Sequence, residues 1–294
     1  LIIAFCLLCA SNLHALGAFI EPLYWRATET IDWSLTNNLN SNNQEITYNT
    51  VNFDFNFGIR IGVNYSGDWD SKFYYTHYNT TANSAVTGNV VSTFLGGKLI
   101  QTPGGSIFFY RDGQVSFNIN FNMLDWDLGK TFRPTEALTL RPIVGLRGGW
   151  IYQTINTSFQ GQDSVNEYVK NNFKGIGPKA AVESKWKIYN HNQWQYNIFA
   201  DFTSAYMYGS WNISDMVNAT SGTTIYINVG SRHMGAVVLQ GIMGFDASYK
   251  RCNIKLGYEI SDWMDQYQVI DDGTGARNSD LILQGLSLRL AYSF

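Results

Sequence analysis

Residues 52–65 form the stretch NFDFNFGIRIGVNY, in which apolar and polar side chains alternate without interruption. The odd positions from Phe53 to Tyr65 are apolar, and the even positions from Asn52 to Asn64 are polar or glycine. Such alternation predicts a β-strand with one apolar face and one polar face. A typical soluble strand has about 5–6 residues, so this strand is unusually long, and its polar face carries both Asp54 and Arg60.

The same pattern recurs along the whole chain. It predicts further strands at residues 17–27, 69–79, 115–128, 138–152, 177–188, 194–211, 236–249, 253–263 and 281–294. Together with residues 52–65 these make about ten strands. In VSFNINFNM (115–123) the apolar positions are odd, whereas Leu124, Trp126 and Leu128 are even. One extra residue in a strand changes the phase in this way, so we expect a β-bulge near Met123–Asp125.

Short and long gaps between these strands alternate. The short joins include residues 66–68, 130–137 and 250–252, whereas the long gaps lie at 28–51, 80–113, 154–173, 212–234 and 264–280. In an up-and-down barrel, alternate connections lie on opposite rims. Short periplasmic turns and long external loops are typical of bacterial outer-membrane barrels. We therefore predict an all-β, closed antiparallel transmembrane barrel of about 10 strands (8–12), with both termini on the periplasmic side.

Composition agrees with this class. Charged residues make up 15% of the 294 residues, against roughly 25% in soluble domains. The net charge is only −3, so nucleic acid is not an expected partner. After residue 16 no apolar run approaches the length of roughly 18–20 residues that a spanning helix needs. Residues 1–15 resemble the end of a secretory signal peptide, which leaves residues 16–294 as one barrel domain.

Alternation alone fits a soluble β-sandwich or lipocalin-like barrel equally well, because it does not say which face points inward. Strand length and the alternating joins favour the membrane barrel. Aromatic residues near strand ends also favour it, as interface girdles: Tyr24, Trp25, Trp69, Trp150, Tyr152, Trp263, Tyr292 and Phe294.

If the apolar face of each strand meets lipid, the polar face lines the lumen. The predicted pore-lining residues are Asp54, Arg60, Arg141, Arg147, Lys179, Glu183, Lys185, Lys187, Asp201, Asp246, Lys255, Glu259 and Arg289. Basic residues outnumber acidic ones in this set, which predicts a lumen that favours anions. A ten-stranded barrel is narrow, however, and small barrels are filled by side chains. A plugged, salt-bridged interior is therefore an open alternative.

Several stretches resemble one known family. The chain ends in GLSLRLAYSF, where Leu286, Leu288, Leu290, Tyr292 and Phe294 alternate like the terminal signal recognised by the outer-membrane barrel assembly machinery. LDWDLGKTF, LTLRPIVGLRGGWIYQ, FKGIGPKAAVESKW and LILQGLSLRLAYSF together resemble the Legionella-type major outer membrane proteins. The resemblance implies an outer-membrane barrel with a porin-like role, in contact with outer-membrane lipid.

Two classes of function remain open. The first is a porin-like protein for passive diffusion of small hydrophilic solutes or ions. The second is a non-conducting structural or adhesin barrel that acts through its surface loops. An enzyme is not expected, because His77 and His233 have no nearby carboxylate partner in sequence and no Gly-x-Ser-x-Gly occurs. We expect no cofactor, no metal and no catalytic residues, and oligomers are possible.

Overall fold

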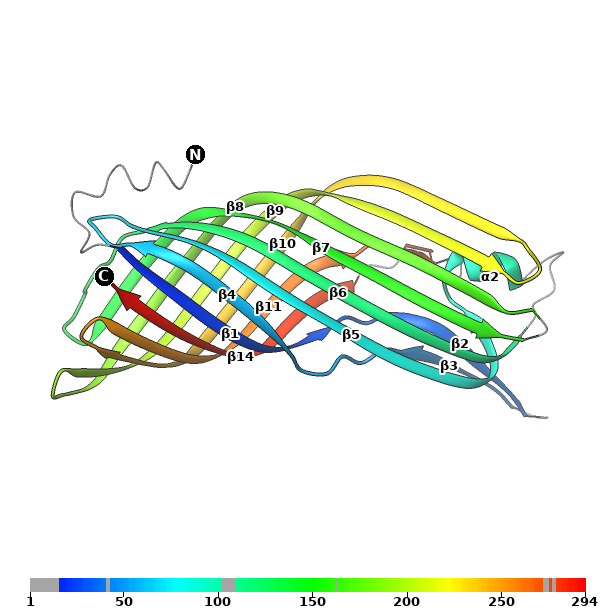
Figure 1. The fold of residues 1–294 in the computed structure, drawn as a ribbon, viewed down its shortest axis with the longest axis horizontal. Helices are drawn as coiled ribbons and strands as arrows, with labels where there is room; N and C mark the ends of the chain where they lie inside the picture. The colour runs from blue at the N-terminus through cyan, green and yellow to red at the C-terminus, as the bar shows by residue number, and fades with distance from the viewer. Residues whose placement is uncertain (1–15, 41–42, 102–108, 162, 272–274, 277–278) are drawn as a thin grey trace.

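The computed structural model describes residues 16–40, 43–101, 109–161, 163–271, 275–276 and 279–294, so the predicted signal segment 1–15 lies outside the described residues. Ten antiparallel strands form a long barrel (Figure 1). They are β1 (Leu16–Thr28), β4 (Asn56–Tyr65), β5 (Asp70–Ser92), β6 (Tyr110–Gly129), β7 (Leu138–Gln160), β8 (Val165–His191), β9 (Trp194–Ala219), β10 (Thr224–Tyr249), β11 (Cys252–Tyr267) and β14 (Ser279–Ser293).

The sheet closes on itself, so its barrel strands leave no free edge whose backbone N–H and C=O groups would be unpaired in lipid. The first strand β1 pairs with the last strand β14, and the Phe294 amide donates to the Leu16 carbonyl at 2.9 Å. Pairing of β5 with β6 completes the ring. The short turns and the C-terminus lie at one end of the barrel (Figure 1). The predicted closed up-and-down barrel of ten strands is confirmed, and its short-turn end is the periplasmic end.

Smaller elements lie at the opposite, external end. A hairpin of β2 (Asp32–Asn40) and β3 (Asn43–Thr50) pairs with the external end of β5. The helix α2 (Leu95–Gln101) follows β5, and β12 (Ile270–Asp271) pairs with β13 (Gly275–Ala276). Much of the sequence between the predicted strands continues the barrel strands instead of forming loops, most clearly in residues 80–92, 165–173 and 224–234.

The strands are much longer than a membrane is thick. β8 has 27 residues, and β9 and β10 have 26 each. At about 3.3 Å per residue and a tilt of about 45°, such strands reach roughly 60 Å along the barrel axis. The apolar band of an outer-membrane barrel is only about 25 Å tall. The external half of this barrel must therefore stand in water.

The two halves have opposite inside-out patterns. In the periplasmic half the outward side chains are apolar and exposed, as in Leu146, Phe202 and Met243, while the inward ones include many charged groups. In the external half most inward side chains are apolar, and Phe173 and Trp211 have no exposed surface. The outward side chains there are mainly Asn, Ser and Thr. The half that meets water therefore has an ordinary apolar core, and the half that meets lipid has a polar one.

This inversion explains the phase change in β6, and the predicted β-bulge is wrong. The pairing of β6 with β5 and β7 is continuous from Ser116 to Leu128. Phe117 and Met123 point inward and are buried, whereas Leu124 and Trp126 point outward and are exposed. The backbone alternates regularly, and it is the sequence that moves its apolar residues to the other face where water gives way to lipid.

In residues 51–65 the sequence keeps its alternation. An interruption of the strand at residues 51–55 moves the apolar side chains from the inner to the outer face of the barrel. Val51 and Phe53 are buried, and Phe53 packs edge-on against Phe117 with 5.1 Å between ring centroids. The strand β4 begins only at Asn56, and Phe57 points outward with 78% of its surface exposed. Phe53 therefore does not face lipid, and Asp54 is exposed outside the strand and does not line the lumen.

The aromatic girdle also differs from the prediction in two places. Tyr24, Trp69, Tyr292 and Phe294 are exposed, as interface residues should be. Trp25 and Trp263, in contrast, are buried inside the barrel with 2% and 0% of their surface exposed. Both occupy inward positions of their strands and belong to the apolar core of the barrel.

The lipid boundary predicts position-dependent costs on one face of β7. Leu146→Lys, at an outward position below the boundary, should destabilise the protein by about 2–4 kcal/mol. Asn156→Lys, on the same face of the same strand but above the boundary, should change stability by less than about 0.5 kcal/mol. The free energy of unfolding in urea, measured in phospholipid vesicles, compares the two. Equal costs would contradict the placement of the boundary.

Candidate functional site in the barrel interior

The periplasmic half of the interior holds an ionic network. Among the described residues eight inward bases form ion pairs with eight inward acids. The bases are Arg60, Lys72, Arg141, Arg147, Lys179, Lys185, Lys255 and Arg289, and the acids are Glu21, Asp70, Asp125, Asp127, Glu183, Asp201, Asp246 and Glu259. Charges in a medium of low dielectric constant need such pairing, because isolated ones are costly.

Arg60 joins three strands in the most buried part of this network. Its guanidinium lies 2.6 Å from Glu21 on β1 and 2.8 Å from Glu259 on β11, and its Nε donates to the Thr76 hydroxyl on β5 at 3.0 Å. Glu21 and Glu259 have 1% and 0% of their surface exposed. The ring of Trp25 lies 5.5 Å from the guanidinium carbon. Arg60 therefore connects the ionic half to the apolar half of the interior.

Other clusters cross the bore. Arg147 on β7 lies 2.8 Å from Asp125 on β6, and Lys179 on β8 bridges Asp125 and Asp127 at 3.0 and 2.7 Å. Closer to the periplasmic end, Glu183 accepts a hydrogen bond from Lys72 and lies 3.2 Å from the Arg141 guanidinium. Lys72 is on β5, across the lumen from β8. The contacts of Lys179 and Lys72 connect strands that are not neighbours in the sheet and fill the space between them, whereas Arg147–Asp125 and Arg141–Glu183 are pairs between neighbouring strands.

Eleven of the thirteen predicted pore-lining residues lie in this interior network. Asp54 is exposed outside the strand, and Lys187 is exposed at the periplasmic rim. The sequence prediction missed Glu21, Asp70, Lys72, Asp125 and Asp127. The last two alternate with Leu124, Trp126 and Leu128, so their inward direction was present in the pattern. With them included, positive and negative charges balance, and the predicted basic excess of the lumen is absent from the described residues.

Little open space remains among these side chains. The cavity bounded by Glu21, Arg60, Lys179 and Glu183 has a volume of about 60 Å³, which is room for about two water molecules. A larger cavity of about 280 Å³ lies at the periplasmic mouth, beside Tyr65, Lys72 and Arg141. The network separates this mouth from the external half.

Apolar side chains fill the external half. Phe117, Ile151, Phe159, Phe173 and Trp211 are fully buried and belong to one continuous core. Residues 266–269, at the end of β11 and just beyond it, are also buried, and the Trp211 indole donates to the Gln266 carbonyl at 2.9 Å. An aqueous path along the axis would have to pass through this core.

The helix α2 is held inside the external end by two buried carboxylates. The Gly96 amide donates to Asp215 on β9 at 2.7 Å, and the Gly97 amide donates to Glu167 on β8 at 2.5 Å. The Ser92 hydroxyl lies 2.8 Å from Glu167. Burial and the neighbouring Asp215 raise the pKa of Glu167 to about 8, and burial raises the pKa of Asp215. Glu167 is therefore mostly protonated at neutral pH.

The remaining sequence candidates lie on the outside of the barrel. His77 points outward and its Nδ1 lies 2.8 Å from the Asn122 side chain, whereas His233 is exposed on β10. Among the described residues neither histidine forms an ion pair with a carboxylate. Leu286, Leu288, Leu290 and Tyr292 form one exposed outward row on β14, in the arrangement that the assembly-signal prediction requires.

Breaking the Arg60 cluster should be costly, and restoring its charge balance should reverse part of the loss. Arg60→Met leaves Glu21 and Glu259 buried with one partner fewer and should destabilise the barrel by about 3–5 kcal/mol. Arg60→Met combined with Glu259→Gln removes one charge of each sign and leaves the Glu21–Arg289 pair intact. Urea unfolding of both variants measures the recovery. If the double variant were as unstable as the single one, the effect would come from lost packing and not from charge.

The raised pKa of Glu167 predicts that docking of α2 weakens at alkaline pH. The protonated form stabilises the folded state fully below the ordinary pKa near 4.5, and this contribution is lost as pH rises through about 8. Hydrogen exchange of residues 93–101 should therefore be faster at pH 9 than at pH 6 after correction for intrinsic rates. Glu167→Gln should remove this difference, and Glu45→Gln at the exposed hairpin should not. Equal protection at both pH values would contradict the prediction.

The comparisons with known proteins give a family but no function. The family model described as the Legionella pneumophila major outer membrane protein precursor matches residues 9–294. No curated protein matches the chain. Among the described residues no helix is long and apolar enough to cross a bilayer.

Solved structures resemble the chain in fold only. The outer membrane protease OmpT of Escherichia coli is 10% identical, with 96% of this chain and 98% of that chain covered and a TM-score of 0.48. The toluene transporter TbuX of Ralstonia pickettii is 7% identical, with 96% and 90% covered and a TM-score of 0.27. The transport unit of the Escherichia coli autotransporter AIDA-I is 8% identical, with 97% and 92% covered and a TM-score of 0.31. At these sequence identities and TM-scores, the structural similarities give no information about the activity of this chain.

The family match and the structure agree on one conclusion. The match covers nearly the whole chain, and the closed barrel has the apolar outer band and polar interior that a lipid bilayer requires. The chain belongs to the Legionella major outer membrane protein family and is a β-barrel of the bacterial outer membrane.

Proposed function

We propose that this protein is a closed outer-membrane barrel that acts through its external half and not by conducting solutes through its bore. The observation that supports this most strongly is the filling of the interior at both levels. Sixteen inward charged side chains pair with one another in the periplasmic half. An apolar core fills the external half.

Both fillings oppose the passage of hydrated solutes. The cavity inside the ionic network holds about 60 Å³, whereas a single water molecule occupies about 30 Å³ in the liquid. A hydrated ion would also have to displace buried aromatic side chains such as Phe173 and Trp211. Removing such groups from a core typically costs about 3–5 kcal/mol each, so an open state would be rare without an external cause.

Porin-like diffusion is the alternative function. Its support is the resemblance to a pore-forming family and the 280 Å³ cavity at the periplasmic mouth. Conduction would require α2 and the apolar core around Phe173 to move aside. Because the interior charges balance, such a path would show weaker selectivity for anions than the basic lumen predicted from sequence.

The external half offers a better surface for a biological role. It extends beyond the apolar band, and its outward side chains are polar and mostly uncharged. Among the described residues, neither His77 nor His233 is paired with a carboxylate as the histidine of a catalytic triad would be. These features support a non-enzymatic role in which the rigid barrel presents its outer face to other molecules.

Recording from planar bilayers tests the closed bore. We expect purified, refolded protein to give no stable conductance steps in concentrated KCl at moderate voltage. A gel-mobility shift between unheated and boiled samples, together with protease protection in vesicles, would verify that the protein is folded and inserted. Stable steps from such verified protein would contradict the closed barrel and favour the porin-like alternative.

A further inference from the structure

The outer face of the barrel carries two hollows that share β7 and β8. One lies at the lipid boundary over β7 to β10, and the other lies above it over β5 to β8. The lower hollow has a volume of about 580 Å³ and is crossed by the cross-strand row Trp150, Lys174, Ser210 and His233. Ile176 and Tyr208, at its lower edge, are 61% and 60% exposed. Below them the outward positions are apolar, and above them they are polar, so this row lies at the boundary itself.

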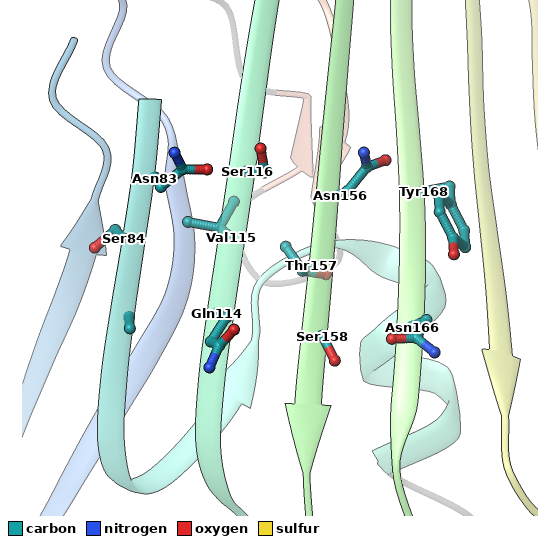
Figure 2. Close-up of a pocket in the computed structure, with 11 residues that line it drawn as sticks. Asn83, Ser84, Gln114, Val115, Ser116, Asn156, Thr157, Ser158, Asn166 and Tyr168 are labelled. Carbon is teal, nitrogen blue, oxygen red and sulfur yellow. The ribbon is translucent and has the colours of Figure 1, made fainter. Parts of the chain in front are cut away.

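The upper hollow, about 640 Å³ in volume, lies over β5 to β8 (Figure 2). Two cross-strand rows line it. The first is Asn83, Ser116, Asn156 and Tyr168, and the second is Ala85, Gln114, Ser158 and Asn166. The side-chain amides of Asn83, Gln114, Asn156 and Asn166 have no hydrogen-bond partner within the described protein. They are therefore free to bind a ligand rich in hydroxyl groups.

Strand β8 connects the two hollows and supplies the charge. From the boundary outward its exposed face carries Ile176, Lys174, Asn172, Lys170, Tyr168 and Asn166. The Lys174 ammonium lies 5.8 Å from the centroid of the Tyr152 ring. Among the described outward positions of β7, β8 and β9 above the boundary there are two lysines and no carboxylate. The face is therefore suited to an anionic ligand.

The distance by which this surface extends above the lipid boundary indicates which kind of ligand could cover it. From Lys174 to Asn166 the strand advances eight residues, which span about 26 Å along the strand, or roughly 19 Å along the axis at a tilt of about 45°. The headgroup layer of an ordinary phospholipid is only about 5–8 Å thick on each side of the hydrocarbon core. A ligand that stands in the membrane and also reaches the upper hollow must carry several sugars above its charged group.

From this geometry we propose that the outer face of the barrel around β8, including both hollows, binds a phosphorylated glycolipid of the outer leaflet. The acyl chains lie on the apolar outward row that begins at Ile176, and the phosphate is placed beside Lys174 and Lys170. Sugars stack on Trp150 and Tyr152 and accept and donate hydrogen bonds in the amide-lined upper hollow. This binding does not depend on whether the bore conducts, because both hollows are on the outside of the barrel.

Binding of purified lipopolysaccharide to the full-length barrel in detergent micelles tests the proposal. We expect Lys170→Ala with Lys174→Ala to weaken binding roughly tenfold or more. The matched control, Lys130→Ala with Lys187→Ala, removes two exposed lysines near the periplasmic end and should change binding by less than about twofold. Gel mobility of unheated samples would verify that all variants are folded.

Two altered ligands complete the test. Dephosphorylated lipopolysaccharide should bind the unaltered barrel about as weakly as intact lipopolysaccharide binds the Lys170/Lys174 variant. The soluble oligosaccharide without acyl chains should bind more weakly than the intact glycolipid. Unchanged binding by the Lys170/Lys174 variant would overturn the proposal. Equal affinity for the deacylated oligosaccharide would overturn it as well, because the ligand would then be a free glycan and not a membrane lipid.

Discussion

The structure depends on one constraint, which is that each long strand passes from water into lipid along its length. A side chain that is favourable on the outside of the barrel in one medium is unfavourable in the other. The chain satisfies both media by exchanging its apolar and polar faces at the boundary. In β6 the sequence changes phase between Met123 and Leu124, while the backbone stays regular. Ahead of β4 the sequence keeps its phase, and the backbone leaves the strand at residues 51–55.

The two interiors follow from this exchange. In the half that lies in the membrane, the apolar side chains point outward into lipid and polar side chains point into the barrel. Buried charges there are tolerable only when they are paired. Arg60 shows the result, because it contacts Glu21 and Glu259 from two other strands. In the half that stands in water, the polar side chains point outward and the apolar ones fill the interior, as in a soluble protein. The barrel is therefore stabilised by an ionic network at membrane level and by an aromatic core above it, and side chains fill the interior in both halves.

Much of the fold could be predicted from the sequence, because alternation is a local property. All ten barrel strands, their antiparallel order and the inward direction of Arg60, Arg141, Lys179 and Glu259 follow from it. Alternation does not reveal which face is inside, so it wrongly predicts that Phe53 and Phe117 face lipid. External strand segments such as 165–173 resemble loops in composition because their outward residues are polar. The partners of the charged residues, such as Lys72 with Glu183, depend on contacts across the lumen that no local pattern contains.

Spin-label accessibility along β6 tests the exchange of faces most directly. Nitroxides at Gln114, Ser116, Leu124 and Trp126 should all be accessible, the first two to a water-soluble relaxation agent and the last two to oxygen dissolved in lipid. Labels at the inward positions Val115, Phe117 and Asp125 should be shielded from both agents. A regular two-residue period in total accessibility, with a change of agent near residue 123, is the predicted result. Lipid accessibility at Val115 and Phe117, with a break in the period between residues 123 and 125, would contradict it.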